Sequence, residues 1–336
     1  MAVEFSDKLL IITGPTATGK TGRAVDVARA LNGEIVSTDS RQVYRDMDLG
    51  TGKDLDEYGD VPYHMIDIVD AGYKYNLYEY LRDARVAIDD IRQRGRVPVV
   101  CGGTGLYVES LAKGVVLPEV PANPELRRQL EGKSLAELTD ILASMKKLHN
   151  TTDVDTVKRA VRAIEIETFY LDNPSAAKAA RPGTQPDQSD ISDQSDKSDK
   201  SDRSDQSDKS DQSGCKPVIV CIDIPVEERR ARITRRLKTR LSDGMVDEVK
   251  ALLDSGISPD DLIYYGLEYK FVTLYLTGQL TYDEMFRQLE IAIHQFAKRQ
   301  MTWFRGMERR GFTLHMLPYD LDRQTFVSRV LDLLKS

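Results

Sequence analysis

An eight-residue run near the N-terminus has the residue types and spacing needed to bind phosphate groups. In chain order, its residues are Gly14, Pro15, Thr16, Ala17, Thr18, Gly19, Lys20 and Thr21. They match G-x-x-x-x-G-K-[ST], in which the glycines let backbone N–H groups converge on phosphate oxygens. Lys20 can place a positive charge on the terminal phosphate, and the Thr21 hydroxyl can bind Mg²⁺. The run therefore predicts a phosphate-binding loop with a Mg²⁺ cofactor.

The alternative, an ordinary glycine-rich turn, is disfavoured because the run follows the apolar segment Leu9–Ile12 and precedes a helical pattern. Most proteins with such a loop transfer or hydrolyse a γ-phosphate, which requires an acid at the end of another apolar strand. The apolar segment Val97–Cys101 is followed by glycines instead, and Asp223 lies far along the chain. A P-loop kinase is thereby weakened but stays an alternative.

Short apolar segments and helical spacing alternate along the chain and must position this loop. Strands are predicted at Leu9–Ile12, Glu34–Ser37, Met65–Val69, Val97–Cys101 and Val218–Ile224. Helices are predicted at Gly22–Leu31, Tyr78–Arg94, Glu125–Lys147, Val154–Tyr170, Val226–Ser255 and Tyr282–Arg310. Strands that alternate with helices indicate an α/β fold with a parallel sheet covered by helices, as in P-loop NTPases. The strand-free middle of the chain predicts an inserted, all-helical subdomain.

These patterns divide the chain into four parts. We expect the first part of the core at residues 1–114, a helical insertion at 115–182, a linker at 183–214 and a return to the core at 215–336. The linker repeats Ser-Asp-x and holds one hydrophobic residue, so we expect it to be disordered. It carries nine Asp against three Lys and one Arg, and thus most of the net charge of −7. The acidic balance of the whole chain therefore does not exclude a nucleic-acid partner.

The cysteines and the apolar runs indicate where the protein works. Cys101, Cys215 and Cys221 form no Cys-x-x-Cys pair, so we expect three free thiols in a reducing compartment. No secretory signal is visible, and no apolar run is long enough to span a bilayer. We expect a soluble, cytoplasmic protein without a membrane partner.

Several further motifs, taken with the phosphate loop, resemble those of the tRNA dimethylallyltransferases, also called tRNA isopentenyltransferases. They are Asp39–Tyr44, Gly50–Lys53, Gly102–Tyr107 and Gln295–Arg305. The resemblance covers about residues 9–315 apart from the Ser-Asp repeat. It implies that the loop binds dimethylallyl diphosphate and that a tRNA anticodon loop supplies the acceptor, N6 of adenosine 37. We expect the protein to be a monomer.

The resemblance also implies three catalytic residues: Asp39, Thr104 and Arg236. An adenine N6 is a poor nucleophile, and a carboxylate at the end of a core strand can take its proton as a general base. Asp39 is placed for that role. Arg236 is expected to stabilise the departing diphosphate together with Lys20 and the loop N–H groups, and Thr104 is expected to line the reaction channel. The ordinary alternative for Asp39 is a helix cap.

A stacked adenine must be turned out of its loop before it can react, and single-stranded loops are recognised by splayed bases and phosphate contacts. By resemblance, the residues expected to contact tRNA are Asp39, Ser40, Arg41, Gln42, Thr104, Arg127, Lys158, Arg159 and Arg162. A C-terminal basic group is expected to add phosphate contacts: Lys298, Arg299, Arg305, Arg309 and Arg310. Solvated helix faces are the alternative for each of these cations.

The chain departs from the family pattern at a few positions. Glu268 precedes Tyr269-Lys270 where a glycine is usual, His294 replaces a usual arginine, and Arg240 stands at a usually apolar position. We expect these changes to lie in or near the elements that face tRNA rather than in the diphosphate site. Prenylation of free AMP is therefore the nearest alternative. The helical insertion and the basic C-terminus disfavour it, because a reaction on a free nucleotide needs neither.

Overall fold

The computed structural model describes residue 5 and residues 8–117, 119–146, 148, 154–174 and 217–336. The chain divides into two compact units, one formed by Met1–Ala112 with Gly214–Ser336 and the other by Lys113–Ser213. The Ser-Asp repeat and Cys215 lie outside the described residues. Cys101 and Cys221 are free thiols, as predicted, and both are buried. Among the described residues, no helix is both long and apolar enough to cross a membrane.

The first unit is built on a six-stranded, all-parallel sheet with the order β3-β2-β4-β1-β5-β6. Its strands are β1 (Leu10–Thr13), β2 (Gly33–Ser37), β3 (Tyr63–His64), β4 (Val97–Gly102), β5 (Val218–Asp223) and β6 (Leu314–Pro318). Strand β1 lies between β4 and β5, with Leu10 opposite both Val99 and Val218. The predicted α/β fold with a parallel sheet is confirmed.

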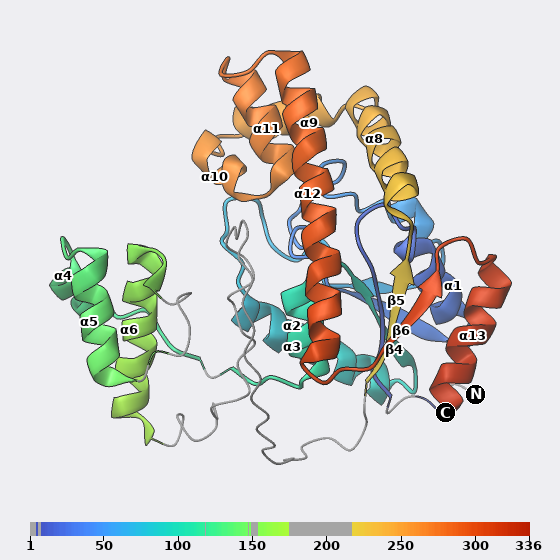
Figure 1. The fold of residues 1–336 in the computed structure, drawn as a ribbon, viewed down its shortest axis with the longest axis horizontal. Helices are drawn as coiled ribbons and strands as arrows, with labels where there is room; N and C mark the ends of the chain where they lie inside the picture. Colours follow the sequence, from blue (N-terminus) through green and yellow to red (C-terminus); the bar gives the residue numbers. More distant parts are fainter. Residues whose placement is uncertain (1–4, 6–7, 118, 147, 149–153, 175–216) are drawn as a thin grey trace. The chain divides into compact units, whose positions relative to one another are not determined.

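Helices cover the sheet, which explains why its inner strands are buried along their whole length rather than at alternate residues. Helices α1 (Lys20–Leu31) and α13 (Arg323–Lys335) contact each other and pack with alternate side chains of β1, β4 and β5 in one core. Figure 1 shows these two helices side by side. Helix α2 (Leu77–Gln93), capped by Asn76, contacts β2 and β4.

The remaining helices of this unit follow β4 and β5. They are α3 (Gly105–Ala112), α8 (Val226–Ser242), α9 (Met245–Asp254), α10 (Pro259–Tyr264), α11 (Leu267–Leu276) and α12 (Tyr282–Arg309). Helices α9, α10 and α11 gather near the upper end of the long helix α12 in Figure 1. The single helix predicted over 226–255 is wrong, because the chain turns at Gly244, whose φ is +105°.

Two other strand and helix predictions need correction. Met65 and Asp67 have φ values of +65° and +55°, so the predicted strand Met65–Val69 does not form. A strand forms instead directly before this segment, at β3. Val69 makes only an isolated bridge to Tyr44. The edge strand β6 and helix α13 were not predicted, although both contribute to the first unit.

The second unit is helical in its described part. It contains α4 (Pro124–Leu130), α5 (Leu135–Met145) and α6 (Val157–Asp172), which share a small core around Leu138 and Leu142. The single helix predicted over 125–147 is wrong, since Gly132 adopts a φ of +78° and Ser134 starts a new helix as its cap.

Candidate active site

The phosphate loop joins the end of β1 to the first turn of α1. Gly19 is in the left-handed region (φ +73°) and is the residue before α1, a conformation that favours glycine. Gly14 lies against the backbone of Ile222, where a Cβ would come within 3.3 Å of the Ile222 carbonyl oxygen. The first turn of α1 has no acidic residue. A loop of this geometry at a helix N-terminus favours an anion.

A glutamine from α12 holds the loop in place. The Thr16 backbone N–H donates to the Gln300 Oε1 at 2.9 Å, and the Gln300 Nε2 donates to the carbonyl oxygen of Gly103 at 2.8 Å. Gln300 is 7% exposed. One buried amide thus connects the phosphate loop to the segment that follows β4. Within the loop, the Thr18 hydroxyl donates to the Pro15 carbonyl oxygen at 3.0 Å.

Asp39 lies just beyond the end of β2, in a tight turn that its own side chain stabilises. The Asp39 Oδ1 accepts a hydrogen bond from the Arg41 N–H at 2.9 Å, and the Asp39 N–H donates to the Ser37 Oγ at 3.2 Å. The Thr104 Oγ1 accepts from the Ser40 N–H at 3.1 Å. Because β2 and β4 are paired neighbours, their carboxyl ends bring Asp39 and Thr104 to the same edge of the sheet.

Gln42 continues this turn into the next loop. Its Nε2 donates to the Gly52 carbonyl oxygen at 3.0 Å, and its Oε1 accepts from the Ser37 hydroxyl at 3.0 Å. Arg41 is half-buried, and its guanidinium lies 5.5 Å from the centroid of the Tyr264 ring. The four residues Asp39 to Gln42 therefore form one ordered turn at the edge of the sheet.

The charges of Asp39 and Arg236 both act on the ionisation of Lys20. Burial lowers the pKa of Lys20, and the charge of Arg236 lowers it too, while Asp39 opposes the change. Burial also lowers the pKa of Arg236 to about 10, with a further contribution from Arg240. Arg236 therefore stays protonated at neutral pH. Lys20 and Arg236 thus bring two half-buried cations to the phosphate loop, an arrangement that suits a polyanionic ligand.

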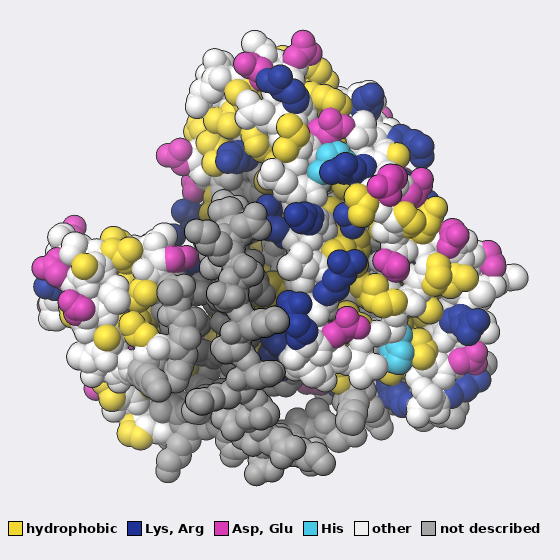
Figure 2. Space-filling model, in the orientation of Figure 1, with side chains coloured by type: hydrophobic (Ala, Val, Ile, Leu, Met, Phe, Trp, Pro, Cys, Tyr) yellow, Lys and Arg dark blue, Asp and Glu magenta, His cyan; other side chains and the backbone are white. Residues whose placement is uncertain are grey.

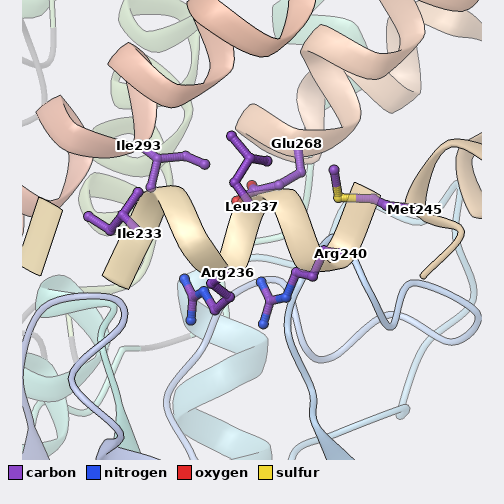
Figure 3. Close-up of a pocket in the computed structure, with 7 residues that line it drawn as sticks. All are labelled: Ile233, Arg236, Leu237, Arg240, Met245, Glu268 and Ile293. Carbon is purple, nitrogen blue, oxygen red and sulfur yellow. The ribbon is translucent and has the colours of Figure 1, made fainter. Parts of the chain in front are cut away.

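Arg236 reaches the phosphate loop from α8. Its Nη2 donates to the Thr16 hydroxyl. Figure 3 shows the guanidinium groups of Arg236 and Arg240 on the same side of α8. The two arginine residues also line a pocket with Glu268 and four apolar residues, Ile233, Leu237, Met245 and Ile293. In Figure 3 both guanidinium groups point away from those side chains.

A carboxylate from α9 fastens the loop that contains Gly50–Lys53. Glu248 accepts hydrogen bonds from three consecutive backbone N–H groups, those of Asp48, Leu49 and Gly50, at 2.9, 2.7 and 3.1 Å. The Tyr269 hydroxyl donates to the same carboxylate at 2.6 Å. Lys53, fully buried, donates to the Tyr44 carbonyl oxygen and pairs with Asp48 and Asp67. These contacts give the loop a fixed shape.

Four of the predicted tRNA contacts belong to the helical unit, three of them arginines with partners inside that unit. Arg127 makes two hydrogen bonds to Glu165, at 2.7 and 2.9 Å, and Arg162 makes one at 2.9 Å. Arg159 pairs with Asp155. Lys158 is exposed. The arginines are thus held in defined positions by buried or half-buried carboxylates.

The C-terminal basic group lies on and just after α12, where Figure 2 shows Lys and Arg side chains along the middle of the view. Lys298, Arg299, Arg305 and Arg309 are exposed. Arg310 differs, because it makes a two-pronged ion pair with the buried Glu109, at 2.8 and 2.7 Å. Trp303 is buried against Gly105, so it packs in the interior rather than facing a ligand.

Comparison with known proteins places this geometry in a family. A family model described as IPP transferase matches residues 42–307, and one described as isopentenyl transferase matches residues 7–58. The chain is 54% identical to tRNA dimethylallyltransferase 2 of Bacteroides fragilis, over 97% of this chain and 98% of that protein. It is 48% identical to tRNA dimethylallyltransferase 1 of Parabacteroides distasonis, over 98% and 99%.

The chain belongs to the tRNA dimethylallyltransferase family. A solved tRNA isopentenylpyrophosphate transferase from Bacillus halodurans shares the fold, with 29% identity, a TM-score of 0.66 and coverage of 98% of this chain and 97% of that one. A eukaryotic dimethylallyltransferase structure matches the fold with a TM-score of 0.71 at 22% identity and covers 96% of this chain and 77% of that one. The predicted family and transferase class are confirmed, and the kinase alternative is wrong.

Thr21 is the residue of the phosphate loop that was expected to bind Mg²⁺. Thr21 is half-buried in the first turn of α1. In the described part of the chain, no cluster of three or more His, Cys, Asp or Glu could hold a metal ion. Mg²⁺ commonly takes most of its ligands from substrate phosphates and water. A single threonine hydroxyl beside a phosphate loop therefore fits Mg²⁺ that arrives with a diphosphate.

Three residues of the site were not singled out from the sequence. Gln300 lies within the C-terminal motif Gln295–Arg305, so the motif could have marked it as a residue of the site. Arg240 was noted only as a departure from the family pattern. Glu248 had no local signal, because its partners lie about 200 residues away in the chain.

Proposed function

We propose that this chain transfers the dimethylallyl group of dimethylallyl diphosphate to N6 of adenosine 37, next to the anticodon of tRNA, to give N6-isopentenyladenosine. Prenyl transfer to tRNA follows from membership of the family. What we propose is the role of each residue in that reaction. One observation supports it above the others: Asp39, Lys20 and Arg236 come from three separate segments and converge beside the phosphate loop.

The phosphate loop, from Gly14 to Thr21, is proposed to bind the donor's diphosphate. Its N–H groups, Lys20 and Arg236 supply positive charge where negative charge grows as the C–O bond breaks. Gln300 keeps the loop in position for this task. Mg²⁺, held by the Thr21 hydroxyl, would neutralise part of the diphosphate charge and improve it as a leaving group.

Asp39 is proposed to act as the general base. N6 of the adenine attacks C1 of the dimethylallyl group, the bond from C1 to the bridging oxygen breaks, and diphosphate leaves with the electron pair. The proton lost from N6 passes to the Asp39 carboxylate. The Asp39 turn, with Ser40, Arg41 and Gln42, and the neighbouring Thr104 are proposed to hold the turned-out base.

The helical unit is proposed to be the tRNA-binding insertion, with Arg127, Lys158, Arg159 and Arg162 as phosphate contacts. Their carboxylate partners fix the direction of each guanidinium without removing all of its donors, since a guanidinium has five N–H groups. The exposed cations of α12 would add further phosphate contacts. We also propose that the protein acts in the cytoplasm, where tRNA is modified, and as a monomer, which light scattering would check.

The test is incubation of the protein with unmodified tRNA, Mg²⁺ and dimethylallyl diphosphate, followed by mass spectrometry of the nucleosides. We expect isopentenyladenosine with the unaltered protein and a loss of at least about a hundredfold in rate with Asp39→Asn. AMP offered in competition separates the two acceptors. A product on AMP with none on tRNA would overturn the proposed acceptor, and full activity of Asp39→Asn would overturn the proposed base.

A further inference from the structure

Arg240 is a buried arginine one helical turn after Arg236. It is 6% exposed, and its guanidinium lies on the same side of α8 as that of Arg236. It packs against Gly52, where an added Cβ would lie 2.0 Å from the Arg240 Nη2. The glycine leaves the space that this guanidinium fills. Both arginines line the pocket shown in Figure 3.

Few direct ion pairs neutralise the two arginines, although the carboxylates of Asp54 and Glu268 are near enough to attract them. Arg240 pairs with Asp54 through one contact of 3.2 Å, and the Asp54 side chain is 51% exposed. Within the described residues, Arg236 has no carboxylate at ion-pair distance, and Glu268 pairs with neither arginine. Two like charges held side by side in a buried place are costly unless an anion neutralises them. The arrangement therefore calls for an anionic ligand with more than one charge.

We propose that Arg240 is a second arginine of the donor site and binds the diphosphate together with Arg236. This inference rests on the proposed function, since the diphosphate is the donor's. Arg236 contacts Thr16, which places the pair beside the phosphate loop. Asp54 acts as a partial counter-ion that keeps Arg240 extended toward the site until the diphosphate arrives. Relatives with an apolar residue at this position would bind the donor with one arginine fewer.

Substitutions of Arg240 test this proposal. Apart from Arg236 and Glu268, the other side chains that line the pocket are apolar, namely Ile233, Leu237, Met245 and Ile293, so Arg240→Met should fold and pack. Lys238→Met is the matched control, because it removes one exposed cation from the same helix. Arg240→Lys keeps the charge and loses the planar, two-pronged geometry. Thermal unfolding of each variant confirms that it is folded.

The measurement is the affinity for pyrophosphate in the presence of Mg²⁺, by isothermal titration calorimetry. We expect Arg240→Met to weaken binding by about tenfold to a hundredfold, Arg240→Lys by less, and Lys238→Met by about twofold at most. A loss with Arg240→Met no larger than that with Lys238→Met would overturn the proposal. If the unaltered protein bound no pyrophosphate, the proposed donor site itself would fail instead, which keeps the two outcomes distinct.

A second variant tests the role given to Asp54. If Asp54 competes with the diphosphate for Arg240, Asp54→Asn should tighten pyrophosphate binding several-fold, and this gain should shrink in the Arg240→Met background. If the pair were purely structural, Asp54→Asn would lower the melting temperature and leave the affinity unchanged, and that result would count against the proposal.

Discussion

The backbone N–H of Thr16 donates to the Gln300 side chain at 2.9 Å, although 284 residues separate the two in the chain. Replacing Gln300 with Leu removes this bond and the bond to the Gly103 carbonyl oxygen, and leaves two polar groups unpaired. We expect stability to fall by about 1–3 kcal/mol and the KM for the donor to rise at least about tenfold. Urea unfolding and steady-state kinetics measure the two effects. The exposed Gln295→Leu on the same helix is the control; equal donor kinetics in both variants would contradict the prediction.

Asp39→Asn tests the general base without a change of shape. The amide oxygen can still accept the Arg41 N–H, so the turn should persist while proton transfer is lost. We expect kcat to fall by about 10²–10⁴ and pyrophosphate affinity to be kept. Asp46→Asn is the matched control, because Asp46 is exposed and has a φ of +61°, which Asn tolerates. A parallel loss of affinity and kcat would point to a misfolded turn rather than a missing base.

Glu248→Ala tests how the loop at Asp48–Gly50 is held. The change removes the acceptor of three backbone N–H groups and of the Tyr269 hydroxyl. We expect a loss of about 2–4 kcal/mol in the free energy of unfolding and faster hydrogen exchange at these N–H groups. Lys250→Ala, exposed on the same helix, should change stability by no more than about 0.5 kcal/mol. Unchanged exchange at Gly50 would show that the loop holds its shape without Glu248.

Glu34 gives a prediction about pH. Burial alone would raise its pKa, but hydrogen bonds from Arg94, His64 and Arg96 outweigh burial and lower the pKa to about 2. A carboxylate with a depressed pKa stabilises the fold above the unfolded-state pKa, near 4.5, and this stability is lost as pH falls toward 2. The loss should reach up to about 3 kcal/mol over that window.

Glu34→Gln is the variant that isolates this effect. It should be less stable than the unaltered protein at pH 7, and the difference should narrow below pH 4, because the unaltered protein then becomes neutral at the same place. Denaturant unfolding between pH 2.5 and 7 measures it. A constant difference across that range would rule out Glu34 as the titrating group.

Local spacing explains which parts of this molecule could be predicted from the sequence. The phosphate loop and the turn at Asp39 are continuous runs next to apolar strands, so their place at the edge of the sheet followed from strand order. Strand β6 was missed because it is a short edge strand with only one fully buried residue, Leu314. Helical spacing of apolar residues continues on both sides of Gly244, so the periodicity of the sequence does not reveal the turn between the two helices.

The contacts that complete the site were beyond prediction for a different reason. Glu248 meets backbone N–H groups, which any sequence could offer, and nothing in residue type marks Asp48–Gly50 as its partner. The pairing of Arg127 with Glu165, which lies 38 residues further along the chain, was hidden in the same way. Side-chain pairs formed across the fold are set by three-dimensional packing.

Strand β5 is the neighbour of β1 in the sheet, yet some 200 residues, the helical unit among them, separate the two along the chain. On a ribosome that adds roughly 5–20 residues per second, β1 therefore waits about 10–40 s for this partner. During that interval β1 lacks a hydrogen-bonding partner along one edge, although its side chains are buried on both faces in the finished fold. The order of synthesis thus makes the nascent protein open to chaperones, and to aggregation, for as long as the ribosome is reading the insertion.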